Sequence, residues 1–293
     1  MLLTTLLLAT PMAALLPAQK EQETPETPAP AEEVESEIVE IDPGEAAREL
    51  KAAFKAKKDD ITLATLDAIG RIPSKLVTKE LGAGLKHQSQ EVILGTLEAL
   101  RHNTDPSALE VLVKQRKNKS ILDDVKAAEA YAYALGQKAD KKCLKPLTDD
   151  LVATSKVSSE VLKAKITALG RIRDVDAIEA ILDYSKTGAV GGRRRGGIKN
   201  IMKEAQRSLI VLTGTDQGTS QQAWQDWWSD NRKSFKMSKK EWSLENARTQ
   251  RQWDNLWKTD EEKESERDAA KDKAKNRKNK NDSDEDEDGE GDF

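Results

Sequence analysis

The sequence holds few of the residues on which disulfide bonding, metal binding and catalysis depend. Its 293 residues include one cysteine, two histidines and only 4% aromatic residues. Lone Cys143 excludes an internal disulfide, and His87 and His102 form no metal-ligand motif with it. No nucleophile elbow, phosphate loop or dinucleotide fingerprint is present. We therefore expect a protein that is not an enzyme and has no cofactor, no metal site and no small-molecule substrate.

The chain does contain a short repeated phrase of three residues, which we expect at the end of a helix. It reads Ala-Ile-Gly at 68–70, Ala-Leu-Arg at 99–101 and Ala-Leu-Gly at both 134–136 and 168–170. The closing residues, here called the anchors, are Gly70, Arg101, Gly136 and Gly170, separated by 31, 35 and 34 residues. A looser copy at 211–213 follows 43 residues later. A fixed period in this range is typical of an α-solenoid built from helix pairs.

Each repeat predicts two helices with apolar stripes. A polar residue always stands four positions after the anchor, and we expect it to cap the first helix: Ser74, Asp105, Asp140 and Asp174. The stripes of the first helices are Ala108, Leu109, Leu112; Cys143, Leu144, Leu147; and Ala177, Ile178, Ile181. The second helices carry Ile61, Val92, Ala127 and Val161, and Asp59 or Asp60 would cap the earliest of them. Since no isolated pair could bury both stripes, neighbouring pairs must stack.

These pairs resemble HEAT repeats, the antiparallel helix pairs of the armadillo/HEAT superfamily, over roughly residues 45–235. The resemblance implies an all-α fold, a right-handed α-solenoid of about five to six helix pairs that occupies residues 45–258. It also implies a scaffold that binds other proteins, although some HEAT-like families are enzymes. The polar ladder of the family is mostly missing, because Ile93, Lys126 and Leu162 stand at its positions.

A tryptophan-rich phrase follows the last copy of the repeat. Set on the repeat frame, Trp224, Trp227 and Trp228 replace core residues of the earlier first helices, so we expect them to close the end of the array. Exposed rings would instead suit stacking on a carbohydrate or a base. The phrase from Leu212 to Arg232 resembles the terminal repeat of exported HEAT-repeat proteins of planctomycete-type bacteria.

Trp242, Trp253 and Trp257 are expected on one face of a further helix from about 239 to 258. Such a helix would either cap the array or offer an aromatic stripe to a partner. The sequence leaves both alternatives open.

The two ends of the chain differ from the repeats. Residues 1–18 have the length and apolarity of a signal peptide with cleavage near Ala18, so we expect an exported, periplasmic or cell-envelope protein; a retained membrane anchor and a cytoplasmic segment are the alternatives. Residues 19–44 form an acidic, proline-rich linker, and 259–293 a charged, acidic tail, both expected to be disordered. The tail holds an incomplete calcium-loop motif at 284–289.

Charge is distributed unevenly along the chain. The formal net charge is −4, yet the acidic segments 19–45 and 260–293 leave the body between them, residues 46–259, at +12. A glycine-rich insertion at 188–197 carries Arg193, Arg194 and Arg195, and Lys199 follows it. The sequence thus favours a non-enzymatic scaffold for an unidentified protein partner. The alternative is a binder of polyanions, nucleic acid or acidic polysaccharide, through this basic body and arginine loop.

Overall fold

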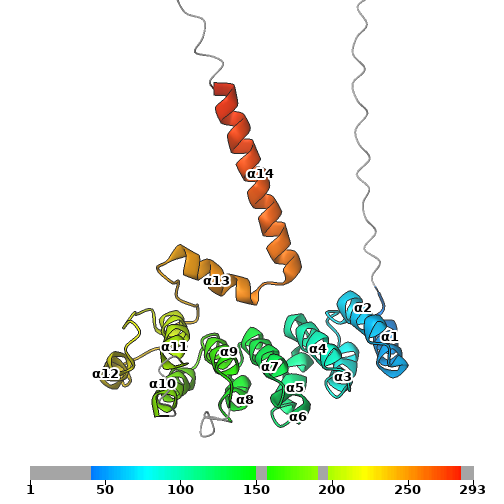
Figure 1. Cartoon of the computed structure of the whole chain (residues 1–293), viewed down its shortest axis with the longest axis horizontal. Coiled ribbons are helices and arrows are strands. Elements are labelled where there is room, and N and C mark those ends of the chain that lie inside the picture. Colours follow the sequence, from blue (N-terminus) through cyan, green and yellow to red (C-terminus); the bar gives the residue numbers. More distant parts are fainter. Residues whose placement is uncertain (1–40, 150–156, 191–196, 285–293) are drawn as a thin grey trace, which may run out of the picture. The chain divides into compact units, whose positions relative to one another are not determined.

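The computed structural model describes residues 41–149, 157–190 and 197–284. Within these ranges the chain is all-α, with fourteen α-helices, one 3₁₀ turn and no strand (Figure 1). The first ten helices are α1 (Pro43–Ala56), α2 (Asp59–Ile69), α3 (Lys75–Gly84), α4 (Gln90–His102), α5 (Pro106–Lys114), α6 (Lys119–Leu122), α7 (Val125–Lys138), α8 (Leu144–Thr148), α9 (Ser159–Leu169) and α10 (Val175–Val190). They are followed by α11 (Gly197–Thr213), α12 (Gln221–Asn231), α13 (Ala247–Trp257) and α14 (Asp260–Asp284); the turn η1 (Lys141–Cys143) precedes α8.

The helices pack sequentially in two rows. In row A, α1 contacts α3 and α3 contacts α5, while α8, α10 and α12 follow one another in the same way. In row B, α2, α4, α7, α9 and α11 each contact the next (Figure 1). Five helices of row A, from α1 to α10, therefore meet the helix that follows them in row B, and most helices also meet the equivalent helix of an adjoining repeat, as the stripes predict.

The predicted caps begin the helices of row A. Ser74 Oγ accepts from the Leu76 amide at 3.2 Å and Asp105 Oδ1 from the Ser107 amide at 2.8 Å. Asp140 and Asp174 accept in the same way, at 2.7 and 2.9 Å, from the amide two residues later. The cap predicted for α2 is wrong: Lys58 holds that position without a side-chain hydrogen bond, and Asp59 and Asp60 lie in the first turn.

The predicted stripes lie in the core, with Leu109 and Leu144 partly buried against it and one residue exposed. Cys143 is fully buried, and burial raises the pKa of its thiol to about 12. Val92, Ala127 and Val161 are buried on row B, but Ile61 is 50% exposed. This difference has a simple reason, because α2 begins row B and has a neighbouring row B helix on one side only.

Polar side chains tie each repeat to the next. The Asn103 amide at the end of α4 donates to the carbonyl oxygens of Gly70 and Ile72 at 3.1 and 2.9 Å. Lys138 at the end of α7 donates to the carbonyl oxygen of Asn103. Burial lowers the pKa of Lys138 to about 8. Successive B helices are thus joined at their carboxyl ends.

Two of the three tryptophans of α12 are buried at the core positions that the repeat frame predicts, and Trp227 is partly buried against the core. Trp224 is 1% exposed and donates its Nε1–H to the carbonyl oxygen of Gly218 at 2.8 Å. Trp228 is 7% exposed, and its ring meets Phe235 edge-on at 5.5 Å. The burial of Trp224 and Trp228 confirms that they are core residues at this end of row A.

The segments after α12 differ from the prediction. The helix expected from about 239 begins only at Ala247, so Trp242 lies in a non-helical stretch before it. Residues 260–284, expected to lack structure, form the long helix α14, whose ion pairs include Lys263–Asp260 and Lys271–Asp268 at 2.8 Å each. Pairs at this spacing stabilise a helix that has almost no apolar face. Among the described residues, no helix has the length and apolarity that crossing a membrane requires.

Replacing Trp224 tests the predicted core at the end of row A. We expect Trp224→Ala to lower the free energy of unfolding by about 3–5 kcal/mol, because a fully buried ring is lost. Leu76→Ala is the control, since Leu76 is 53% exposed on α3, and it should change that free energy by less than about 1 kcal/mol. Urea unfolding followed by circular dichroism measures both, and equal losses would contradict the placement of Trp224.

Candidate functional site

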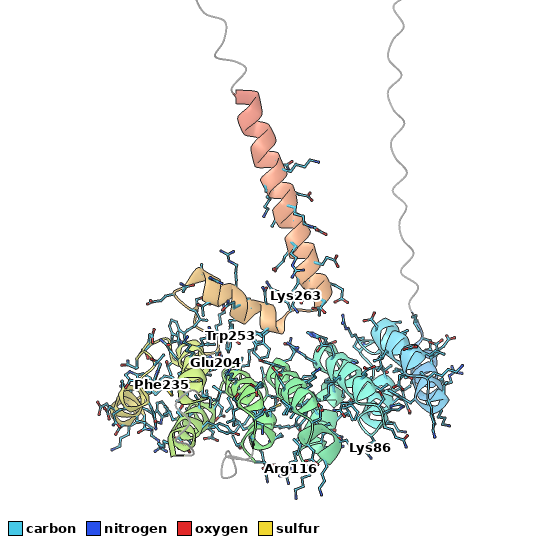
Figure 2. All side chains as sticks on the ribbon, in the orientation of Figure 1. Lys86, Arg116, Glu204, Phe235, Trp253 and Lys263 are labelled. Atoms are coloured by element: carbon cyan, nitrogen blue, oxygen red, sulfur yellow. The ribbon has the colours of Figure 1, made fainter. Side chains whose placement is uncertain are left out.

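After α12 the chain returns across row B in the reverse order of the repeats. We call residues 238–262, which include α13, the strap. It meets the end of each B helix in turn: Trp242 at Gly214, Trp253 at Gly170, Trp257 at Gly136, the Leu256 carbonyl at Arg101 and Glu261 at Arg71. Figure 1 shows α13 lying across the row B helices, and Figure 2 shows Trp253 between α13 and that row. The anchors and their neighbours thus form one continuous binding face for a segment of the chain itself.

The tryptophan rings of the strap lie where the anchors leave room for them. A Cβ placed on Gly170 would be 2.8 Å from the Trp253 ring, and one on Gly136 would be 3.0 Å from the Trp257 ring. The two rings pack edge-to-face at 5.7 Å, and the Arg171 guanidinium lies 4.9 Å from the centre of the Trp257 ring. Glycine at these anchors therefore admits aromatic side chains onto row B.

Arginines at the ends of the B helices hold the backbone of the strap. Arg173 donates to the carbonyl oxygens of Ser238 and Lys240 at 3.1 and 2.9 Å, and also to that of Val211 at 2.8 Å. Arg101 donates to the carbonyl oxygen of Leu256. These bonds do not depend on the side chains of the strap, so they would suit many sequences.

Two acidic side chains of the strap meet two further arginines. Glu241 pairs with Arg171 at 2.6 Å and accepts from Trp253 Nε1 at 3.1 Å through its other oxygen. Glu261 pairs with Arg71 at 2.7 Å, and this hydrogen bond lowers the pKa of Glu261 to about 2. The acidic contacts therefore fix the two ends of the strap against row B.

A cavity of 660 Å³ lies between row B, α13 and the start of α14. Its lining is mixed in charge, with three carboxylates and four cationic groups beside Tyr133 and Trp253: Glu129, Glu160, Glu204, Lys163, Arg207, Lys263 and Arg267. Burial and the nearby Glu160 raise the pKa of Glu129. In the described part of the chain no three His, Cys, Asp or Glu side chains converge as metal ligands would. The cavity thus holds charged side chains of both signs.

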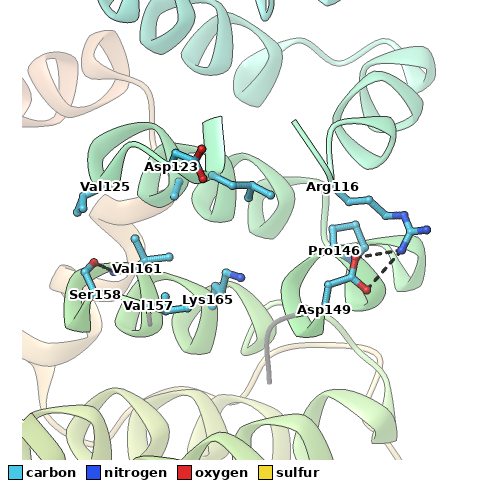
Figure 3. A pocket seen from close by; sticks show the side chains of 11 residues that line it. Arg116, Asp123, Val125, Pro146, Asp149, Val157, Ser158, Val161 and Lys165 are labelled. Atoms are coloured by element: carbon cyan, nitrogen blue, oxygen red, sulfur yellow. Dashed lines mark hydrogen bonds and ion pairs between the residues drawn. The ribbon is translucent and has the colours of Figure 1, made fainter. Parts of the chain in front are cut away.

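A second groove, of 570 Å³, lies between α6, α7, α8 and α9 (Figure 3). Leu122 and Val125 are 39% and 47% exposed in its wall, and the Arg116–Asp149 ion pair of 3.0 Å lies at one end. Figure 2 shows Arg116 and Lys86 on the side of row A, away from α13. This groove is therefore separate from the strap.

Of the site residues predicted from the sequence, the structure brings Trp253 and Trp257 together, with their ring centres 5.7 Å apart. Arg193, Arg194 and Arg195 lie outside the described residues, and Lys199 belongs to α11 without a described side chain. Trp242 is 50% exposed, whereas Trp253 and Trp257 are 3% and 7% exposed and contact the chain's own helices. The alternatives were a helix that caps the array and a helix that offers an aromatic stripe to a partner. In the structure α13 covers row B with Trp253 and Trp257.

Sequence reasoning missed the arginines that hold the strap. A signal was present, because the phrase Gly-Arg-Ile follows the repeat at both 70–72 and 170–172. Its role depends on a segment 70 to 190 residues away, which no local pattern identifies.

Comparison with known proteins adds no relative. No family model matches the chain, and a search of curated proteins found no match.

Proposed function

We propose that residues 45–258 form a right-handed α-solenoid of about five to six HEAT-like helix pairs, and that the protein is a non-enzymatic scaffold for another protein. The fixed period of the anchors, the cap four residues after each and the sequential packing in two rows support this proposal. Residues 1–18 lie outside the described part of the chain, and export to the periplasm or cell envelope belongs to the same proposal.

The observation that carries the proposal is the way row B holds the strap. Residues at the ends of five successive B helices contact one continuous segment, through its backbone carbonyls, its aromatic rings and two of its carboxylates. Laying a helix into a groove lined by other helices is a common mode of peptide recognition. A face that binds a segment of its own chain has the chemistry to bind one from a partner.

Cross-linking tests the scaffold and its face together. The full chain, with an amine-reactive cross-linker, should capture a protein from the native cell envelope and join it mainly through Lys163, Lys203 and Lys263. These lysines line the cavities beside the strap. Lys86, Lys117 and Lys119, exposed near the turns of row A, are the internal control. Links spread evenly over both groups, or no protein enriched over an unrelated helical bait, would contradict the proposal.

Polyanion binding is the second candidate, favoured by the net charge of +12 on residues 46–259. Exposed Lys86, Lys114, Lys117 and Lys119 lie in or beside the turns that join row A to row B. The arginines at 193–195 fall between α10 and α11, in the corresponding connection of a later repeat. Cations of this kind neutralise phosphates or sulfates.

The salt dependence of duplex DNA binding tests this second candidate. Each cation that neutralises a phosphate adds about −0.9 to the slope of log K against log salt, so an alanine triple variant at Arg193, Arg194 and Arg195 should reduce the slope by about 2–3. Lys273→Ala with Lys275→Ala on exposed α14 is the matched control and should leave the slope unchanged. No measurable binding near 0.1 M salt, or equal slopes for the two variants, would exclude the arginine loop as a polyanion site.

A further inference from the structure

We infer that the strap is a built-in competitor for the peptide site on row B, and that a partner displaces it with a helical segment of similar chemistry. That segment would carry two aromatic residues one helical turn apart and carboxylates toward its ends. The inference rests on the proposed scaffold function and adds the class of ligand and the means of regulation.

The strap is attached to row B as a separate layer. Trp253 and Trp257 bury their rings with Val211 and Leu244 in a small apolar cluster distinct from the main core, which runs through both rows. The stretch from 235 to 246 that leads into α13 is non-helical. An element with so small a share of the core opens at a lower free-energy cost than the rows beneath it.

Some buried hydrogen-bond donors between the strap and row B have no acceptor among the described residues. The Nε–H groups of Arg101 and Arg171 and the Nε1–H of Trp257 are buried, and none has an acceptor among the described residues. Each buried donor without an acceptor costs about 1–3 kcal/mol. A partner that supplies carboxylate or carbonyl oxygens at Arg101 and Arg171 would therefore replace the strap favourably.

The contacts already made define the partner's chemistry. Gly136 and Gly170 accept rings at positions one helical turn apart, as Trp253 and Trp257 show. Arg171 and Arg71 accept carboxylates, and Arg173 and Arg101 accept backbone carbonyls. Row B itself contributes three carboxylates, Glu129, Glu160 and Glu204, and only two cations, Lys163 and Arg207, to the cavity beneath the strap, so this part of the face favours a peptide over a nucleic acid.

A peptide of residues 238–262 is the probe, titrated against the full chain by fluorescence anisotropy. In the wild type the tethered strap competes at an effective concentration that reaches the millimolar range for short linkers, so the peptide should bind weakly. The full-length double variant Trp253→Ala with Trp257→Ala loosens the strap and should bind the peptide at least about tenfold more tightly. The same peptide with both tryptophans replaced by alanine should not bind.

Two further full-length variants control for misfolding. Glu261→Gln removes only the exposed pair with Arg71, and should tighten peptide binding by up to about fivefold. Arg251→Ala, on the exposed side of α13, should match the wild type. Equal affinity for wild type, double variant and Glu261→Gln, or equal binding of the alanine peptide, would overturn the inference. A partner cross-linked equally to wild type and double variant would leave the scaffold standing and remove only the strap's role.

Discussion

The structure depends on the close approach of neighbouring B helices at the anchors. A Cβ placed on Gly70 would lie 2.8 Å from the Cβ of Ala99, and one on Gly136 would lie 2.8 Å from the Cα of Ala168. Ala99 and Ala168 are each the first residue of the repeated phrase in the next repeat. The glycine of one phrase thus receives the alanine of the following one, which gives the repetition of these letters a direct packing cause. Arg101 departs from this pattern and instead reaches the strap.

The same small residues connect the fold to the proposed function. Where two B helices pack together at a glycine, the missing side chain leaves room for an indole ring on their outer surface. Trp253 and Trp257 lie against Gly170 and Gly136 in this way. The arginines that follow Gly70 and Gly170 have their backbones fixed by that packing, so their guanidinium groups are positioned for carboxylates. A sequence feature required for stacking the repeats therefore also shapes the face that holds the strap.

Much of the fold could be predicted because its signals are local. The caps at Ser74, Asp105, Asp140 and Asp174 act within one turn, and the stripes follow the helical period. Ile61 was misplaced because its exposure depends on a missing neighbour in row B, not on periodicity. The strap was mostly missed, since contacts such as Arg71–Glu261 join residues 190 apart. The helix α14 was missed because its segment has few apolar residues, which predicted disorder, whereas ion pairs within the helix stabilise it.

The stability of two glycine variants measures the packing at the anchors most directly. Gly136→Ala should lower the free energy of unfolding by about 1–3 kcal/mol, because its Cβ would meet the backbone of Ala168. Gly82→Ala is the matched helical control, whose Cβ would lie 3.4 Å from Val111, and it should be neutral or stabilising by up to about 1 kcal/mol. Equal effects of the two substitutions, measured by urea unfolding, would contradict the close approach of the B helices.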